Sequence, residues 1–211
     1  MTNYYSKLDW EKFIQNAHPL IKDFHKKETK YLKNLSGHVL EIGSGTGRTL
    51  KVLSENCSRV IGIDKEKIMV LKSKANIKNL KNVEIHKQNA KNLEFERGYF
   101  DYVICMGSTF SNLGKDKVTV LKEMKRVLKK QGKMIISVYN EKALSARLES
   151  YSKDELEHTK ITKDGTVYSK EGLFSEQFTK EKLQKLFNSS KLKYKITNLN
   201  PISYLCICKK N

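Results

Sequence analysis

The chain has 211 residues, of which 38% are hydrophobic and 30% are charged. This length can bury a core, and no apolar run approaches the roughly 20 residues that a membrane span needs. The start of the chain lacks the basic and then apolar order of a signal peptide, and the four cysteines form no C-x-x-C pair. We therefore expect a cytoplasmic protein with no membrane partner, no metal site and no disulfide.

The net charge is +18, which favours an anionic partner such as RNA. However, only five of the 41 basic residues are arginines, whose planar fork suits phosphates best. The lysines are spread over nearly every segment of the chain. This distribution favours a lysine-rich surface and leaves RNA as an alternative partner.

Residues 8–34 carry apolar side chains at spacings of three and four, which predicts amphipathic helix. Pro19 lies inside this pattern, and proline cannot continue the hydrogen bonds of a helix interior. Two helices, or one kinked helix, are therefore expected. We assign residues 1–36 to an N-terminal helical extension and residues 37–211 to the main domain.

From residue 38 short β-type runs alternate with helical ones. Strands are predicted at His38–Ile42, Arg59–Ile63, Val83–His86, Tyr99–Met106 and Lys133–Tyr139. Helices are predicted between them at Thr46–Glu55, Glu66–Asn76 and Lys115–Leu128. This alternation implies parallel strands with right-handed crossovers. Gly132 is expected to end the third helix as a left-handed cap.

The alternation breaks after Tyr139. A helix is predicted at 141–150, and the stretch "TKITKDGTVYSK" that follows has Asp164-Gly165 between β-type flanks, which indicates a hairpin. We interpret residues 151–177 as a small cap insertion. It follows the fifth strand, so it is expected at the rim where open α/β sheets bind their ligands.

A helix that begins at Thr179 and two closing strands at Lys193–Thr197 and Ser203–Cys208 complete the chain. The short connection "NLNP" predicts that these two strands pair antiparallel at one edge. The expected fold class is therefore α/β: a seven-stranded, mostly parallel, doubly wound sheet with an antiparallel C-terminal hairpin, N-terminal helices and a small cap insertion.

The stretch "VLEIGSGTGRTL" places three glycines at alternate positions behind the first strand. A phosphate-binding P-loop needs a lysine directly after its last glycine, which is absent here. A dinucleotide turn needs G-x-G-x-x-G, but Arg48 occupies its third position and Gly47 comes one residue early. Neither phosphate motif fits.

What remains is E-x-G-x-G-x-G, formed by Glu41, Gly43, Gly45 and Gly47, with Ser44 inside the turn. This pattern resembles the first motif of class I S-adenosylmethionine (SAM) dependent methyltransferases. SAM carries no phosphate, so glycine is needed for close approach of the backbone. The resemblance implies that this turn binds SAM and that Glu41 faces its cationic side, which would make residues 37–211 a SAM-binding Rossmann-like domain.

Two further elements extend the resemblance. Asp64, with Lys65 beside it, follows the second strand at the distance where adenosine ligands have their ribose hydroxyls bound by a carboxylate. In the family an acidic residue and an alanine after the third strand contact the adenine. Asn89 and Ala90 occupy these positions, and an asparagine carbonyl can still accept from the adenine amine.

The resemblance also places the residues after the fourth strand between SAM and the acceptor, so Cys105 and Met106 are expected to contact the cofactor. The stretch "MGSTFSNL" is similar to "GSTIGN" of enzymes that methylate the α-amino group of histidine. By this similarity Asn112 is a candidate acceptor-site residue, with helix or turn capping as the alternative. The motif [DNS]-P-P-[YF] of enzymes that methylate base amino groups is absent.

Further acceptor-site candidates come from segments outside the family core. Tyr139 ends the fifth strand, Tyr168 and Ser175 lie in the cap insertion, and Tyr5, beside Tyr4, is expected to cover the SAM site as a lid. No catalytic set of serine, histidine and aspartate is evident. In-line methyl transfer depends mainly on alignment, so none is required.

The function predicted from this resemblance is SAM-dependent methyl transfer to a small-molecule acceptor, with an amine or carboxylate preferred. Methylation of RNA or of a ribosomal protein is the first alternative, and a SAM-binding module without catalysis is the second. The sequence fits a monomer or a homodimer.

Overall fold

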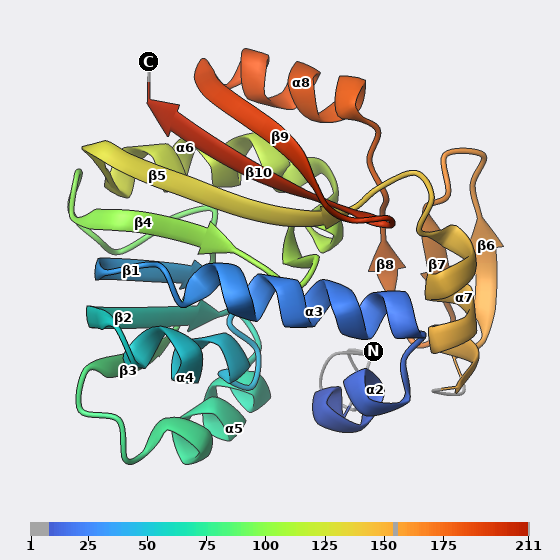
Figure 1. The fold of residues 1–211 in the computed structure, drawn as a ribbon, viewed down its shortest axis with the longest axis horizontal. Helices are drawn as coiled ribbons and strands as arrows, with labels where there is room; N and C mark the ends of the chain where they lie inside the picture. Colours follow the sequence, from blue (N-terminus) through green and yellow to red (C-terminus); the bar gives the residue numbers. More distant parts are fainter. Residues whose placement is uncertain (1–8, 154–155, 211) are drawn as a thin grey trace.

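The computed structural model describes residues 9–153 and 156–210, so Tyr4 and Tyr5 lie outside the described residues. A seven-stranded sheet forms the centre of the molecule (Figure 1). Its strands, from one edge to the other, are β3 (Val83–Lys87), β2 (Cys57–Asp64), β1 (Gly37–Ile42), β4 (Phe100–Cys105), β5 (Leu128–Tyr139), β10 (Ser203–Lys210) and β9 (Leu192–Asn200).

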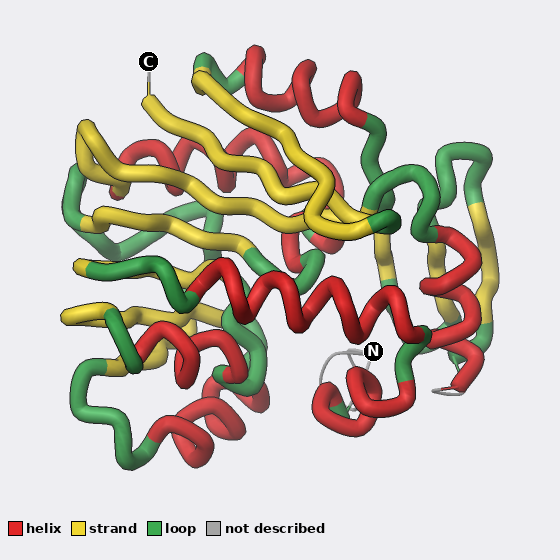
Figure 2. The backbone as a smooth tube through the Cα atoms, in the orientation of Figure 1, coloured by secondary structure: helices red, strands yellow, loops and turns green. Residues whose placement is uncertain are grey.

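The first five strands pair in parallel, whereas β10 runs antiparallel between β5 and β9. This topology confirms the predicted seven-stranded sheet and its antiparallel closing pair. The strand order reverses between β1 and β4, which opens a crevice at their carboxyl ends. The loops that follow these strands gather at that edge (Figure 2).

Helices cover both faces of the sheet (Figure 1). On one face α3 (Pro19–Leu32), α4 (Arg48–Ser54) and α5 (Lys67–Ile77) share a buried apolar cluster with the strands. On the other face α6 (Lys117–Val127) and α8 (Lys180–Ser189) form a second cluster. Two apolar layers on one sheet explain why the central strands have few polar residues.

The described N-terminal residues, from Asp9 onward, form two helices, α2 (Trp10–Asn16) and α3, which is one of the two alternatives predicted. Pro19 is the first residue of α3, where its missing N–H costs no hydrogen bond, and His18 caps the helix through its ring. Asn200 Nδ2 donates to Leu20 O over 2.7 Å, which holds α3 against the end of β9.

The prediction that Gly132 ends the third helix as a left-handed cap was wrong. Helix α6 ends at Val127, and β5 begins at the next residue, Leu128, whose backbone is already extended. Gly132 therefore lies inside β5, where a Cβ would come within 2.8 Å of the carbonyl oxygen of Asp101. This glycine permits a close approach of two strands and does not end a helix.

The helix predicted at 141–150 is α7 (Leu144–Lys153). The predicted cap that follows it, residues 151–177, contains a small antiparallel sheet of β6 (His158–Ile161), β7 (Val167–Ser169) and β8 (Phe174–Ser175). The β6–β7 turn contains Gly165 at φ +77°, so the expected hairpin is present with a longer connection. The cap lies beyond the carboxyl ends of the strands (Figure 1). Within the described residues, no helix is long and apolar enough to cross a membrane.

Candidate functional site

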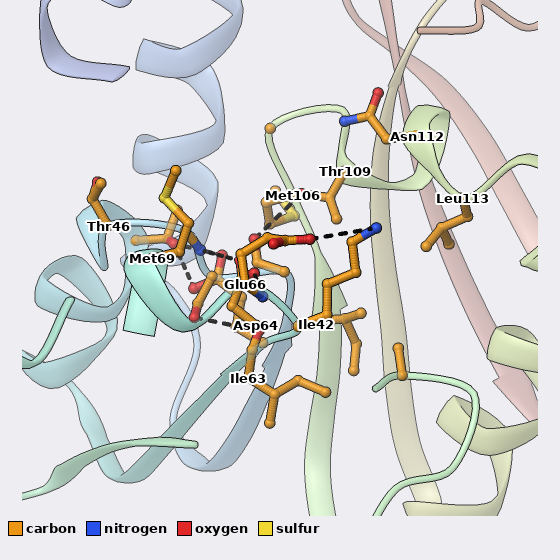
Figure 3. A pocket seen from close by; sticks show the side chains of 18 of the residues that line it. Ile42, Thr46, Ile63, Asp64, Glu66, Met69, Met106, Thr109, Asn112 and Leu113 are labelled. Atoms are coloured by element: carbon orange, nitrogen blue, oxygen red, sulfur yellow. Dashed lines mark hydrogen bonds and ion pairs between the residues drawn. The ribbon is translucent and has the colours of Figure 1, made fainter. Parts of the chain in front are cut away.

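A cavity of about 340 Å³ lies at the carboxyl ends of β1, β2 and β4, within the usual size range of ligand pockets. The turns and loops that follow these strands line it, together with residues of α2 and α3. Figure 3 shows Asp64 and Met69 on the β2–α5 side and Thr109, Asn112 and Leu113 on the loop that follows β4. The cavity thus occupies the crevice that the strand order creates.

The glycine turn forms one wall of the cavity. Gly43 has φ +67°, and a Cβ there would collide with the side chain of Thr109 from the loop after β4. Its N–H and that of Ser44 donate to Ile63 O over 2.8 and 3.0 Å, which fixes the turn against β2. Gly43, Ser44 and Gly45 line the cavity.

Gly47, the third glycine of the motif, does not line the cavity. It precedes α4 with φ +87°, and a Cβ there would lie 2.6 Å from Ser73 Oγ of α5. A side chain at this position would push α4 and α5 apart. The structure therefore places Gly47 at a helix–helix contact.

Glu41 is the last but one residue of β1, and its carboxylate is buried in the cavity wall. Thr49 Oγ1 of α4 contacts both carboxylate oxygens. Burial raises the pKa of Glu41 to about 7, although the hydrogen bond from Thr49 and the charge of Arg48 act to lower it. A carboxylate that is costly to ionise without a partner is suited to a cationic ligand.

Asp64 ends β2 and is held by two backbone N–H groups. Gly45 N donates to Oδ2 over 3.0 Å and Glu66 N donates to Oδ1 over 2.9 Å. Burial raises the pKa of Asp64, and these two hydrogen bonds oppose the effect. Each oxygen keeps a further lone pair, so the carboxylate can accept from the two hydroxyls of a ribose.

The remaining predicted cofactor residues divide into two groups. Lys65, Asn89, Ala90 and Met106 line the cavity. The Asn89 side chain also accepts from Lys91 N over 3.1 Å, which shapes the loop after β3. Cys105 does not line the cavity: it lies in the core that faces α6 and α8, and burial raises the pKa of its thiol. Strand alternation turns its side chain away from the site.

Of the acceptor-site candidates, Asn112 lines the cavity. Tyr139 is buried beneath α3, with its ring 5.4 Å from that of Phe24. Ser175 is buried in the cap and bonds Arg147 and Tyr151, whereas Tyr168 is exposed on β7. None of the three lines the cavity, and Tyr5 lies outside the described residues.

Sequence reasoning missed the contribution of α3. His25 and Arg48 line the cavity, and both contact Glu28, whose side chain is fully buried. Glu28 also accepts from Gly107 N over 2.7 Å and from Ser137 Oγ. The signal available in the sequence was a histidine and a glutamate three residues apart on one helix face, a spacing that also occurs in surface ion pairs.

The sequence profile that describes a methyltransferase domain matches residues 33–191. The chain belongs to the methyltransferase-domain family. A demethylmenaquinone methyltransferase of Lactococcus lactis subsp. lactis is 38% identical over 115 residues, which cover 52% of this chain and 45% of the relative. An uncharacterized methyltransferase of Bacillus subtilis, YcgJ, is 33% identical over 102 residues, which cover 46% of this chain and 39% of YcgJ. The chain thus spans about half the length, or less, of these two relatives.

Solved structures share the fold. The DhpI–SAH complex has a TM-score of 0.72 at 16% identity and covers 99% of this chain and 94% of its own. A SAM-dependent methyltransferase from Aquifex aeolicus has a TM-score of 0.67 at 18% identity, and the match covers 96% of this chain and 98% of that protein. The family match confirms the predicted methyltransferase class, and the solved structures confirm the predicted fold.

Proposed function

We propose that this chain transfers the methyl group of SAM to a small-molecule acceptor, and that the preferred acceptor is an amine. The observation that carries the proposal is the charge of the cavity. Five carboxylates line it, those of Glu11, Glu41, Asp64, Glu66 and Asp116, against the three basic side chains of Arg48, Lys65 and Lys91. In a chain with a net charge of +18, this is a local reversal of sign.

Ion pairs within the described part of the chain leave three of these five carboxylates without a basic partner. Each of the three basic side chains lies within 4 Å of a carboxylate: Arg48 of Glu28, Lys65 of Glu66, and Lys91 of Asp116. Among the described residues, Glu11, Glu41 and Asp64 have no such basic partner. A cavity of this kind attracts a sulfonium and an ammonium, and it repels the phosphates of RNA and the charge of a carboxylate acceptor.

Two further observations support a small acceptor. Glu11 and Ile14 of α2 line the cavity, so the N-terminal helices contribute to its walls. Relatives of the chain carry the name demethylmenaquinone methyltransferase, which refers to a small-molecule acceptor. The high lysine content remains the argument for RNA, but the lysines that line this cavity are already paired.

Different residues of the site would have different roles in methyl transfer. Bound SAM would supply an electrophilic methyl group on a positively charged sulfur. The glycine turn, Asp64 and Asn89 would hold the cofactor, and Glu41 would balance its positive charge. Met106 and Asn112, on the loop after β4, would align the acceptor. Holding the reacting atoms in line away from water can supply most of the rate acceleration.

The test is to incubate the protein with methyl-labelled SAM and a cell extract, and then to separate small molecules, RNA and protein. The expected result is label in the small-molecule fraction that survives mild alkali, because methyl esters hydrolyse under that treatment and methylamines do not. Label confined to RNA or protein would refute a small acceptor. SAM binding without label in any fraction would support a non-catalytic module.

A further inference from the structure

We infer that His25 is the base that takes a proton from the acceptor during methyl transfer, and that Glu28 positions its ring for this role. The inference rests on the proposed function and narrows it. The acceptor would be a group whose reactive atom carries a proton on arrival, such as an ammonium. Such a group has no free lone pair until it loses that proton, so its methylation requires a base.

The geometry begins with a buried pair on α3. His25 Nδ1 lies 2.9 Å from Glu28 Oε2, and the Glu28 side chain is fully buried. The other carboxylate oxygen accepts from Gly107 N over 2.7 Å and from Ser137 Oγ. Glu28 therefore joins three elements: α3, strand β5 and the loop that follows β4. This leaves the His25 ring little freedom.

The partners of Glu28 determine the tautomer of His25. Burial acts to raise the pKa of Glu28, but hydrogen bonds and charges from His25, Arg48 and Ser137 more than offset it, and the net shift is downward. An ionised carboxylate can only accept, so Nδ1 must carry the proton. Arg48 Nη2 is 3.4 Å from both Nδ1 and Oε2, and of these two only the carboxylate can accept from it.

The other ring nitrogen, Nε2, is then a free acceptor when the ring is neutral. No hydrogen bond within the described part of the chain uses Nε2. His25 lines the cavity, and His18, His38, His86 and His158 do not. A carboxylate that holds Nδ1–H and leaves Nε2 without a hydrogen-bond partner is an arrangement suited to a general base.

His25 also lies at the expected acceptor end of the cavity. Its Cε1 atom, which joins the two ring nitrogens, would be 3.9 Å from a Cβ on Gly107, in the loop after β4. Met106 and Gly107 of this loop line the cavity together with His25. The base is thus next to the segment that aligns the acceptor.

The proposed step balances in atoms and electrons. The acceptor loses its proton to His25 Nε2, and the electron pair of that bond forms the new bond to the methyl carbon. The bond between methyl and sulfur breaks, and its electron pair passes to sulfur, which becomes neutral. The imidazolium that forms is stabilised by the Glu28 carboxylate and returns its proton to water.

The first test needs no acceptor. Sinefungin, a SAM analogue with an amine in place of the transferred methyl, is added to protein labelled with ¹⁵N-histidine. We expect the His25 resonances, assigned by their loss in His25→Gln, to show a protonated Nδ1 and an Nε2 signal that shifts on binding. His38 serves as the internal control and should not respond. A protonated Nε2, or an Nε2 signal unchanged by bound sinefungin, would overturn the inference.

The second test uses the labelled small-molecule fraction as acceptor. His25→Gln should lower single-turnover methyl transfer about 100-fold or more while the Kd for SAM stays within about threefold, since general bases typically contribute that much. Imidazole should restore part of the rate in His25→Ala, whose cavity opens where the ring was. Full activity of His25→Gln, or loss without imidazole rescue, would contradict a base. Label found in RNA would refute the small acceptor but leave the sinefungin result valid.

Discussion

At the scale of single residues, Glu41 is expected to favour SAM binding and to reduce the stability of the folded protein. Its pKa of about 7 reflects burial without a basic partner, and a bound cation would favour the ionised form. SAM affinity should therefore rise as pH increases through 7, and binding at pH 7 should release a proton. Calorimetric titrations in buffers of different ionisation enthalpy measure this release. The same heat in every buffer would contradict the assignment.

The same carboxylate should reduce stability at high pH. The folded pKa of about 7 lies above the ordinary 4.5, so the stabilisation is present below 4.5 and is lost as pH rises through 7. In urea titrations at pH 8, the free energy of unfolding of Glu41→Gln should thus exceed that of the wild type by on the order of 2 kcal/mol. At pH 5 this difference should be much smaller. It should also bind SAM at least about tenfold more weakly. The exposed Glu96→Gln should change neither property.

At the scale of elements, the turn between β1 and α4 depends on Gly43. An alanine there would force a side chain into a left-handed backbone and against Thr109 of the loop after β4. We expect Gly43→Ala to lower stability by roughly 1–3 kcal/mol and SAM affinity at least about tenfold. Gly172→Ala is the control, because Gly172 has φ +92° but nothing within 4 Å of its Cβ position. Equal SAM affinities of the two variants would refute this account.

The cap depends on Arg147 of α7. This side chain is fully buried, donates to Gly165 O, Gln177 Oε1 and both oxygens of Ser175, and lies over the ring of Tyr139. Arg147→Met should cost about 3 kcal/mol, because it leaves these acceptors buried and unpaired. Urea unfolding measures the cost, and limited proteolysis should cut within 158–177. Stability equal to that of the exposed control Arg97→Met would show that the cap is held by other contacts.

At the scale of the whole molecule, the basic surface and the acidic cavity should respond differently to salt. Binding to a polyanion such as poly(U) should weaken steeply between 50 and 200 mM KCl, because it releases counterions. SAM affinity and methyl transfer should change less than about threefold over this range, since the basic side chains that line the cavity are paired with carboxylates. Methyl transfer that falls in parallel with poly(U) binding would indicate an RNA acceptor.

Local patterns were enough to predict most of the fold. Strand and helix periodicity gave the seven strands and the antiparallel closing pair, and Pro19 indicated the break between α2 and α3. The E-x-G-x-G-x-G motif located the turn that forms one wall of the cavity, since Glu41, Gly43 and Gly45 are neighbours along the chain and all line the cavity. These features depend on interactions within a few residues, which a sequence displays directly.

The tertiary structure decided which side chains meet. It placed Gly47 against Ser73 and turned Cys105 into the core, because helix packing and strand orientation are set by the other elements of the fold. It also brought Glu28, which pairs with His25 on the same helix, against Ser137, which is 109 residues away. A helix pattern records which face is apolar, but the partner of a buried polar group is fixed only when the layers pack.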